Sequence, residues 1–297
     1  MTTSATTARR VAPSTSLRSS ASPVTTERRV VYRTRGRQHG PITRLMSPSD
    51  LGEVLRPFVF LDHFDTAGTS TANFGLHPHS GIATATWVME GHVSYEDTTG
   101  ETGIIPTGGL EWMQAGGGVW HGGSFGDAPR VRGFQLWVAL PPDLELGPAK
   151  SVYLMPDRIH RDGPVSVLLG SYGAAASDIA VPSPLSYLSV SLKAGDRWTY
   201  QPPPEHTVGW AAISQGSLRS PAALQAGELA VFEESNEPID FHAETDVELV
   251  LGSAVKHPHD LVLGYYSVHS NAAALRDGES RIQQIRSRLR AEGRVDF

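Results

Sequence analysis

The chain has 297 residues, a formal net charge of −6 and no cysteine. This length suits one large domain or two ordinary domains with ample core. Without cysteine the chain has no disulfide, thiolate nucleophile or sulfur-bound metal, so any metal must be held by nitrogen and oxygen ligands. The low charged fraction (19%) and the 30 glycines and 21 prolines are typical of many short strands joined by turns.

The N-terminal segment is basic and poor in large apolar side chains. It carries a charge of about +4 over residues 1–29, which leaves about −10 for the remainder of the chain. We expect residues 1–28 to be a disordered extension, because this composition buries too little apolar surface to fold. The segment lacks the continuous apolar core of a secretory signal, so we expect a cytoplasmic protein. Because its composition is also similar to that of a transit peptide, a nuclear or organellar location is the alternative.

The rest of the chain predicts neither a nucleic-acid partner nor a membrane protein. It is acidic and lacks a basic stripe, which argues against direct nucleic-acid binding. Its longest apolar runs, such as residues 58–61 and 249–251, are far too short to cross a bilayer.

Beyond Arg29 the sequence alternates between β-rich segments and Gly/Pro turns. The strands that we expect are 29–35, 57–64, 82–89, 92–98 and 131–140 in the first half, and 187–192, 208–213, 229–232 and 247–251 in the second half. Apolar and threonine residues alternate over residues 82–88, as in a strand with one packed face.

A weak internal repeat predicts two copies of one unit. Residues 79–91 correspond to 206–216, and residues 105–110 correspond to 224–229. After residue 271 the pattern changes, because Ile282, Ile285 and Leu289 recur at helical spacing. The division that we expect is a first domain over residues 29–165, a second over 166–270 and a C-terminal helix over 271–297.

Three histidines of the first copy favour a metal site. His77 and His79 lie at i and i+2 of an extended segment, so both side chains point to one face. His121 can return on a neighbouring antiparallel strand and complete a three-nitrogen set around one divalent ion. Imidazole is a ligand for iron, zinc, copper and nickel. The alternative is two turn residues and one buried, hydrogen-bonded histidine, but three histidines in this arrangement favour the metal.

Longer segments around these histidines carry a family resemblance. They read PFVFLDHF at 57–64, TWVMEG at 86–91, EWMQAGGG at 111–118 and GFQLWVALP at 133–141. In this order and at this spacing they resemble the pirin family, over about residues 29–269. The resemblance implies an all-β fold of two tandem cupin (jelly-roll β-barrel) domains packed face to face, with the metal in the first barrel.

The resemblance also implies a ligand set. In pirins three histidines and a glutamate hold the metal, and the histidines carry over to His77, His79 and His121. Iron is the first choice of metal, with zinc, nickel, copper and manganese as alternatives. The family glutamate falls at Gly123, so we expect weaker metal binding, which Gly123→Glu should tighten. Glu111 could reach the pocket, but strand parity and its distance from His121 along the chain favour an ordinary solvated carboxylate.

Several other residues are expected to have structural roles. In the second copy His206 is surrounded by apolar residues, and His257 and His259 fall in a proline-containing surface loop. His63, next to Asp62, could contact the pocket, but a position at the surface or behind the metal ligands is favoured. Aromatic residues of the first copy are expected to pack in the core or at the rim, with room for one of them to line a pocket: Trp112, Trp120, Phe134 and Trp137.

The function implied by the resemblance is a metal-dependent oxygenase of the quercetin 2,3-dioxygenase type, weakened by the loss of the glutamate. Its substrate would be small and aromatic or flavonol-like, and the protein would be a monomer. One alternative is a non-catalytic, metal- or redox-responsive regulator that binds a transcription factor or a metabolic enzyme. A weaker one is another cupin activity, such as isomerisation of a small sugar or acid. No catalytic residue and no organic cofactor is assigned.

Overall fold

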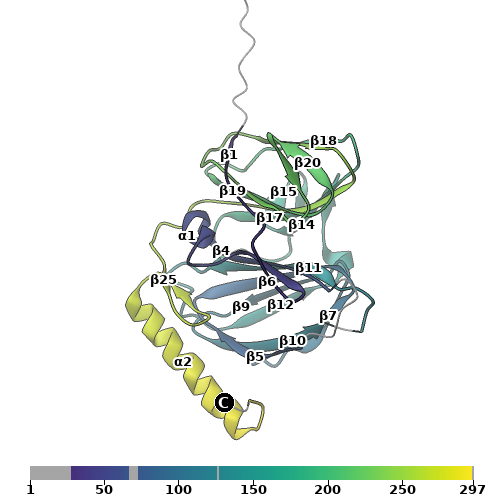
Figure 1. Ribbon diagram of the computed structural model, residues 1–297. Coiled ribbons are helices and arrows are strands. Elements are labelled where there is room, and N and C mark those ends of the chain that lie inside the picture. Colours follow the sequence, from purple (N-terminus) through teal and green to yellow (C-terminus); the bar gives the residue numbers. More distant parts are fainter. Residues whose placement is uncertain (1–27, 67–72, 126, 296–297) are drawn as a thin grey trace, which may run out of the picture.

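The computed structural model describes residues 28–66, 73–125 and 127–295. Within these ranges strands predominate, and the helices are α1 (Leu51–Leu55), η1 (Pro156–Arg158) and α2 (Ala272–Ala291). The strands form two barrels, and α2 follows them at the C-terminal end of the chain (Figure 1). The predicted all-β fold with a C-terminal helix is confirmed. The predicted disordered extension lies outside the described residues, except for Arg28.

The first barrel pairs a seven-stranded sheet with a four-stranded sheet. The larger sheet contains, in spatial order, β12 (Lys150–Leu154), β9 (Leu110–Gln114), β6 (Ile82–Glu90), β11 (Arg132–Ala139), β4 (Phe58–Asp65), β3 (Ile42–Met46) and β2 (Arg37–His39). The smaller sheet contains β5 (Asn73–His79), β10 (Val119–Phe125), β7 (His92–Asp97) and β8 (Thr102–Pro106). Neighbouring strands are antiparallel, so successive side chains alternate between the barrel interior and its outside.

The second barrel repeats this arrangement. Its larger sheet contains β1 (Val30–Thr34), β22 (Leu229–Phe232), β19 (Val208–Gln215), β24 (Val247–Ala254), β17 (Leu185–Leu192), β14 (Val165–Leu169) and β13 (Arg161–Asp162). Its smaller sheet contains β18 (Arg197–Tyr200), β23 (Ile239–Ala243), β20 (Ser217–Ser220) and β21 (Ala222–Gln225). The short strands β15 (Ser171–Tyr172) and β16 (Ala175–Ala176) form a separate pair.

The first strand of the chain belongs to the second barrel. β1 pairs with β22, and the buried Arg28 just before it donates hydrogen bonds to the carbonyls of Thr207 and Glu233. The predicted division at residues 165 and 166 did not anticipate this pairing, because it placed residues 29–35 in the first domain. The first described residues therefore tie the N-terminal end of the chain to the far barrel.

The two seven-stranded sheets face each other and enclose the largest apolar cluster (Figure 1). Phe58 of the first barrel meets Trp210 of the second with ring centroids 5.4 Å apart. Trp87 of β6 also belongs to this cluster, whereas Thr84 and Thr86 of the same strand point the other way and are buried as well. The expectation of one packed face on this strand is therefore wrong: both faces are buried, and the threonine face looks into the barrel.

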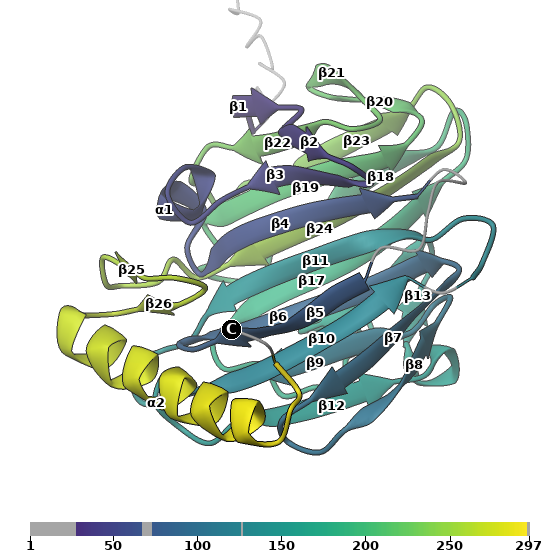
Figure 2. The same cartoon turned by 60° about the horizontal axis from the view of Figure 1, so that its bottom comes forward.

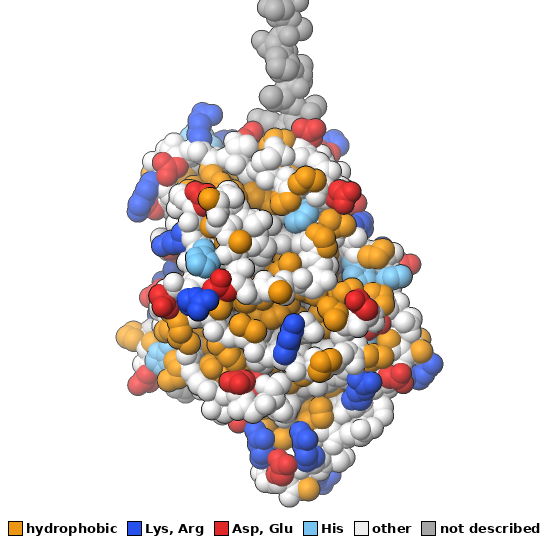
Figure 3. All heavy atoms as spheres, turned by 180° about the vertical axis from the view of Figure 1, so that it is seen from behind, with side chains coloured by type: hydrophobic (Ala, Val, Ile, Leu, Met, Phe, Trp, Pro, Cys, Tyr) orange, Lys and Arg blue, Asp and Glu red, His pale blue; other side chains and the backbone are white. Residues whose placement is uncertain are grey.

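The C-terminal segment returns from the second barrel to the first. It forms β25 (Val262–Leu263), β26 (Val268–His269) and then α2, which runs beside the first barrel (Figure 2). The indole N–H of Trp120 donates to the carbonyl of Ile282 at 2.9 Å, and the Ile282 side chain is buried. Among the described residues, no helix combines the length and apolar character needed to cross a membrane. Acidic and basic side chains are interspersed on the face that Figure 3 shows.

Candidate metal centre

β5 and β10 lie side by side in the smaller sheet of the first barrel and bring three histidines together. His77 and His79 lie two residues apart on β5, and His121 on β10 pairs directly with His77. The ring centroids are separated by 4.5 Å (His77 and His121), 4.9 Å (His79 and His121) and 5.0 Å (His77 and His79). One nitrogen from each ring lies within 4.8 Å of those of the other two. Small side-chain rotations would bring these nitrogens to the separation of about 3 Å expected for ligands of one ion.

Hydrogen bonds fix which nitrogen each β5 histidine offers. The Nδ1 atom of His77 lies 2.9 Å from the carbonyl oxygen of Gly75, and that of His79 lies 3.2 Å from the carbonyl oxygen of Tyr266. A carbonyl can only accept, so Nδ1 carries the proton in both rings and Nε2 keeps its lone pair. This is the arrangement by which metal-bound histidines are usually oriented.

Two of the three histidine rings contain a buried nitrogen that lacks a hydrogen-bond partner. The Nε2 atoms of His79 and His121 are buried and have no hydrogen-bond partner, a situation that costs about 1–3 kcal/mol per group. Burial lowers the pKa of His77 to about 4 and holds that of His79 well below its usual range, with the neighbouring His121 contributing in the same direction. Both rings are therefore neutral at pH 7, which is the form that binds metals. This donor set fits one divalent ion.

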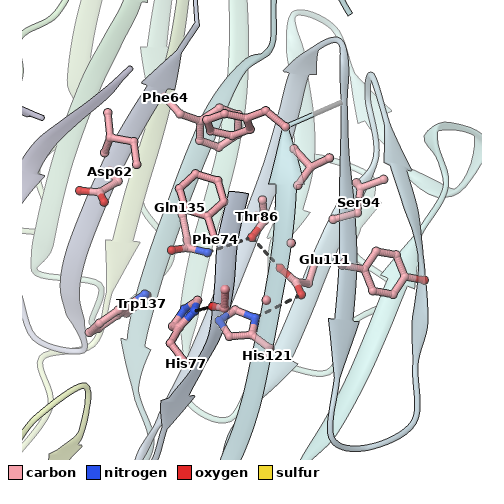
Figure 4. Close-up of a pocket in the computed structure, with 18 of the residues that line it drawn as sticks. Asp62, Phe64, Phe74, His77, Thr86, Ser94, Glu111, His121, Gln135 and Trp137 are labelled. Carbon is pink, nitrogen blue, oxygen red and sulfur yellow. Dashed lines mark hydrogen bonds and ion pairs between the residues drawn. The ribbon is translucent and has the colours of Figure 1, made fainter. Parts of the chain in front are cut away.

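Glu111 on β9 approaches the histidines from the opposite sheet. The residue is only 3% exposed, and Thr86 donates a 2.6 Å hydrogen bond to its Oε2 atom. Its Oε1 atom lies 3.9 Å from Nδ1 of His121 (Figure 4). The expectation of a solvated carboxylate is wrong. Trp112 packs between the two barrels, so the alternation of the strand turns the preceding side chain, Glu111, into the first barrel.

Gly123 on β10 lines the same cavity but leaves no room for a side chain. A Cβ atom at this position would lie 2.2 Å from the carbonyl oxygen of Ser94 on the adjacent strand β7. The obstacle is backbone, which cannot move aside without parting the two strands. The expectation that Gly123→Glu would simply restore a ligand therefore does not hold for this backbone.

A cavity of about 340 Å³ opens beside His77 and His121. Most of its larger side chains are aromatic: Phe60, Phe64, Phe74, Tyr95, Phe125, Trp137 and Tyr266. Of the four aromatic residues expected to pack in the first copy, Trp137 lines this cavity, with its ring centroid 4.7 Å from that of His79. Polar side chains also line it, among them Arg44, Asp62 and Gln135.

Tyr266 is a cavity residue that the sequence did not reveal. It lies between β25 and β26, far along the chain from His79, to which its carbonyl is hydrogen-bonded. Its ring centroid lies 5.8 Å from those of His77 and His79. No local pattern could have indicated this contact, because it exists only after the C-terminal segment has folded back onto the first barrel.

The remaining histidines of interest lie away from the cavity. His63 makes a hydrogen bond to Ser214 in the second barrel, so it contributes to the contact between barrels. His206 is buried against Ser253. His257 is buried whereas His259 is exposed, so the predicted surface loop is only partly exposed. In the part of the chain that the structure describes, the three-residue cluster with metal-ligand spacing is His77, His79 and His121.

Comparisons with known proteins agree with this picture. The Pirin family model matches residues 41–138. A pirin-like protein of Caulobacter vibrioides is 30% identical over 223 residues, which cover 71% of this chain and 79% of that protein. A Pseudomonas aeruginosa protein named "Putative quercetin 2,3-dioxygenase" is 32% identical over 230 residues, which cover 70% of this chain and 78% of that protein.

Solved structures share the fold at lower identity. A crystal structure of quercetin 2,3-dioxygenase from Acinetobacter baumannii superimposes with a TM-score of 0.75 at 23% identity and covers 86% of this chain and 96% of its own. A bacterial pirin from Escherichia coli in complex with nickel(II) gives a TM-score of 0.61 at 19% identity, covering 78% of this chain and 97% of its own.

Proposed function

The chain belongs to the pirin family, and we propose that its first barrel is a mononuclear divalent-metal site that acts on a small aromatic, flavonol-like substrate. The observation that carries the proposal is the set of three converging histidines, two of which hold buried Nε2 atoms without hydrogen-bond partners. The reaction proposed is that of quercetin 2,3-dioxygenase, the activity in the names of related proteins. Iron remains our first choice of metal, and nickel is the leading alternative because a family member binds it.

The residues around the proposed site suit such a substrate. A bound divalent ion would act as a Lewis acid toward an enolate oxygen of the substrate. The aromatic walls of the cavity, among them Trp137 and Tyr266, would receive planar rings and exclude water. A volume of about 340 Å³ lies near the lower end of the range for small-molecule sites. His77 and His79, kept neutral by burial, would hold the ion without competing for protons.

A second function is favoured by Gly123. This position has neither a carboxylate nor room for one, so the site lacks a charged ligand there. A non-catalytic, metal- or redox-responsive regulator that binds a transcription factor or a metabolic enzyme would tolerate this loss. This alternative predicts metal binding without turnover. The monomeric state, the cytoplasmic location and the absence of a nucleic-acid partner also remain predictions.

The test begins with elemental analysis of protein purified without an affinity tag. We expect close to one divalent ion per chain in the wild type and almost none in His79→Ala. His259→Ala is the matched control, because it changes the second histidine of the other His-Pro-His motif at an exposed position, and it should keep its metal. Equal metal content in His79→Ala and the wild type would contradict the proposed site.

Quercetin turnover with oxygen consumption then separates the two functions. Turnover by the metal-loaded wild type that is lost in His79→Ala supports the oxygenase. Stoichiometric metal without turnover supports the regulator.

A further inference from the structure

We propose that Glu111 is the positioning residue of this metal site: its carboxylate holds the ring of His121 with Nε2 toward the other two histidines and supplies the negative charge that cannot be placed at Gly123. The inference rests on the proposed function of the site. It concerns a residue for which the sequence favoured an ordinary solvated carboxylate.

The first step concerns the orientation of the three rings. His77 and His79 are each held at Nδ1 by a backbone carbonyl, which leaves Nε2 free to bind a metal. The corresponding atom of His121 faces Oε1 of Glu111 at 3.9 Å, and the buried Nε2 of His121 lacks a hydrogen-bond partner. In Figure 4 the His121 ring lies between His77 and Glu111. Glu111 thus occupies, for His121, the place that a carbonyl occupies for each of the other two rings.

The second step concerns how firmly the carboxylate is held. Glu111 on β9 pairs with Thr86 on β6, and the threonine hydroxyl donates to Oε2 at 2.6 Å. The side-chain amide of Gln135 in turn lies 3.4 Å from the threonine oxygen. These contacts leave Oε1 directed toward His121. The present separation is about 1 Å longer than an N–H···O hydrogen bond, and binding of an ion at Nε2 would make Nδ1–H a stronger donor.

The third step concerns charge. Three neutral imidazoles leave the +2 charge of an ion uncompensated in a buried site, which disfavours binding. The other carboxylate that lines the cavity, Asp62, forms two 3.0 Å hydrogen bonds with Arg44 and is already compensated. Glu111 instead faces His121, with its Oε1 atom 3.9 Å from Nδ1 of that ring. It can therefore offset the charge of the ion through the histidine ring, without a ligand at Gly123.

The test is a competition titration in which the full-length chain, stripped of metal, competes with a chelator for Ni²⁺. Glu111→Gln keeps the shape and an acceptor for Thr86 but removes the charge, and it should weaken nickel binding about 10- to 100-fold. Asp62→Asn removes a negative charge from the same cavity and should leave the affinity unchanged. In the zinc-loaded protein, the downfield Nδ1–H resonance of His121 should be present in the wild type and absent or shifted in Glu111→Gln.

The outcomes separate this inference from the proposed function. Nickel binding by the wild type together with equally tight binding by Glu111→Gln overturns the inference alone. A Glu111 oxygen within about 2.0–2.2 Å of the ion also overturns it, because the residue would then be a ligand. Failure of the wild type to bind nickel overturns both. If Glu111→Gln does not fold, Thr86→Val replaces it: this variant keeps the carboxylate but removes its anchor, and it should weaken binding in the same direction.

Discussion

Gly123→Ala is predicted to destabilise the first barrel although it adds a single methyl group. The new Cβ atom would lie 2.2 Å from the Ser94 carbonyl oxygen, whereas ordinary contacts begin at 3.4 Å. β7 and β10 must therefore part by about 1 Å next to the paired residues Gly123 and Tyr95. Overpacking of this kind costs about 1–3 kcal/mol, a large part of a total stability of about 5–15 kcal/mol.

The matched control is Gly75→Ala on the neighbouring strand β5. A Cβ atom there has nothing within 4 Å, and the backbone has no left-handed strain. In a thermal melt Gly123→Ala should lower Tm by about 2–4 °C per kcal/mol lost, while Gly75→Ala should melt close to the wild type. Nickel affinity should fall in Gly123→Ala as well, because β10 also carries His121. Wild-type stability in Gly123→Ala would show that the two strands can separate freely, and our argument against a side chain at this position would be refuted.

Three further predictions follow from other parts of the molecule. Tyr266→Ala should weaken quercetin binding about three- to tenfold in a fluorescence titration, because it removes an aromatic wall of the cavity. The metal content should stay unchanged, because His79 is hydrogen-bonded to the backbone carbonyl of residue 266, which the substitution keeps. Burial lowers the pKa of His63 to about 4, so between about pH 6.5 and 4 the unfolded chain binds a proton that the folded chain does not. The free energy of unfolding should therefore fall as the pH drops, by at most about 1.4 kcal/mol per pH unit. In His63→Gln the free energy of unfolding, measured with urea at several pH values, should depend less steeply on pH. Ile282→Ala should cost about 2–5 kcal/mol in urea unfolding, whereas Ile285→Ala, at a partly exposed position of the same helix, should cost much less.

Local patterns predicted several of the strands and indicated the three histidines. The strand predicted at residues 82–89 is β6 (Ile82–Glu90), and the one predicted at 229–232 is β22 (Leu229–Phe232). The approach of His77 and His79 follows from their i, i+2 spacing on one strand. Such features depend on neighbours in the sequence, so they can be inferred without the fold.

Features that depend on distant segments were missed. The pairing of β1 with β22 joins residues about 200 positions apart, and backbone pairing leaves no local trace in either strand. Tyr266 reaches the site only through the returning C-terminal segment. Glu111 is an intermediate case. The sequence indicates that Glu111 and Trp112 point to opposite faces of their strand, but only the packing of the two sheets shows that Trp112 faces the other barrel.

The contrast between the two barrels explains where a site can form. The interior of the second barrel is filled by large apolar side chains, including Trp198, Tyr200, Phe232 and Phe241. The first barrel instead encloses a cavity beside the histidines, which both aromatic side chains and polar ones such as Thr86 line. Filling the interior stabilises the second barrel through apolar burial, but it removes the space that a ligand requires. On its outside the first barrel packs against the second barrel through the apolar cluster between the large sheets and against α2 through Trp120 and Ile282. The two barrels therefore differ in their interiors: the second is packed with apolar side chains, and the first contains a cavity beside the histidines.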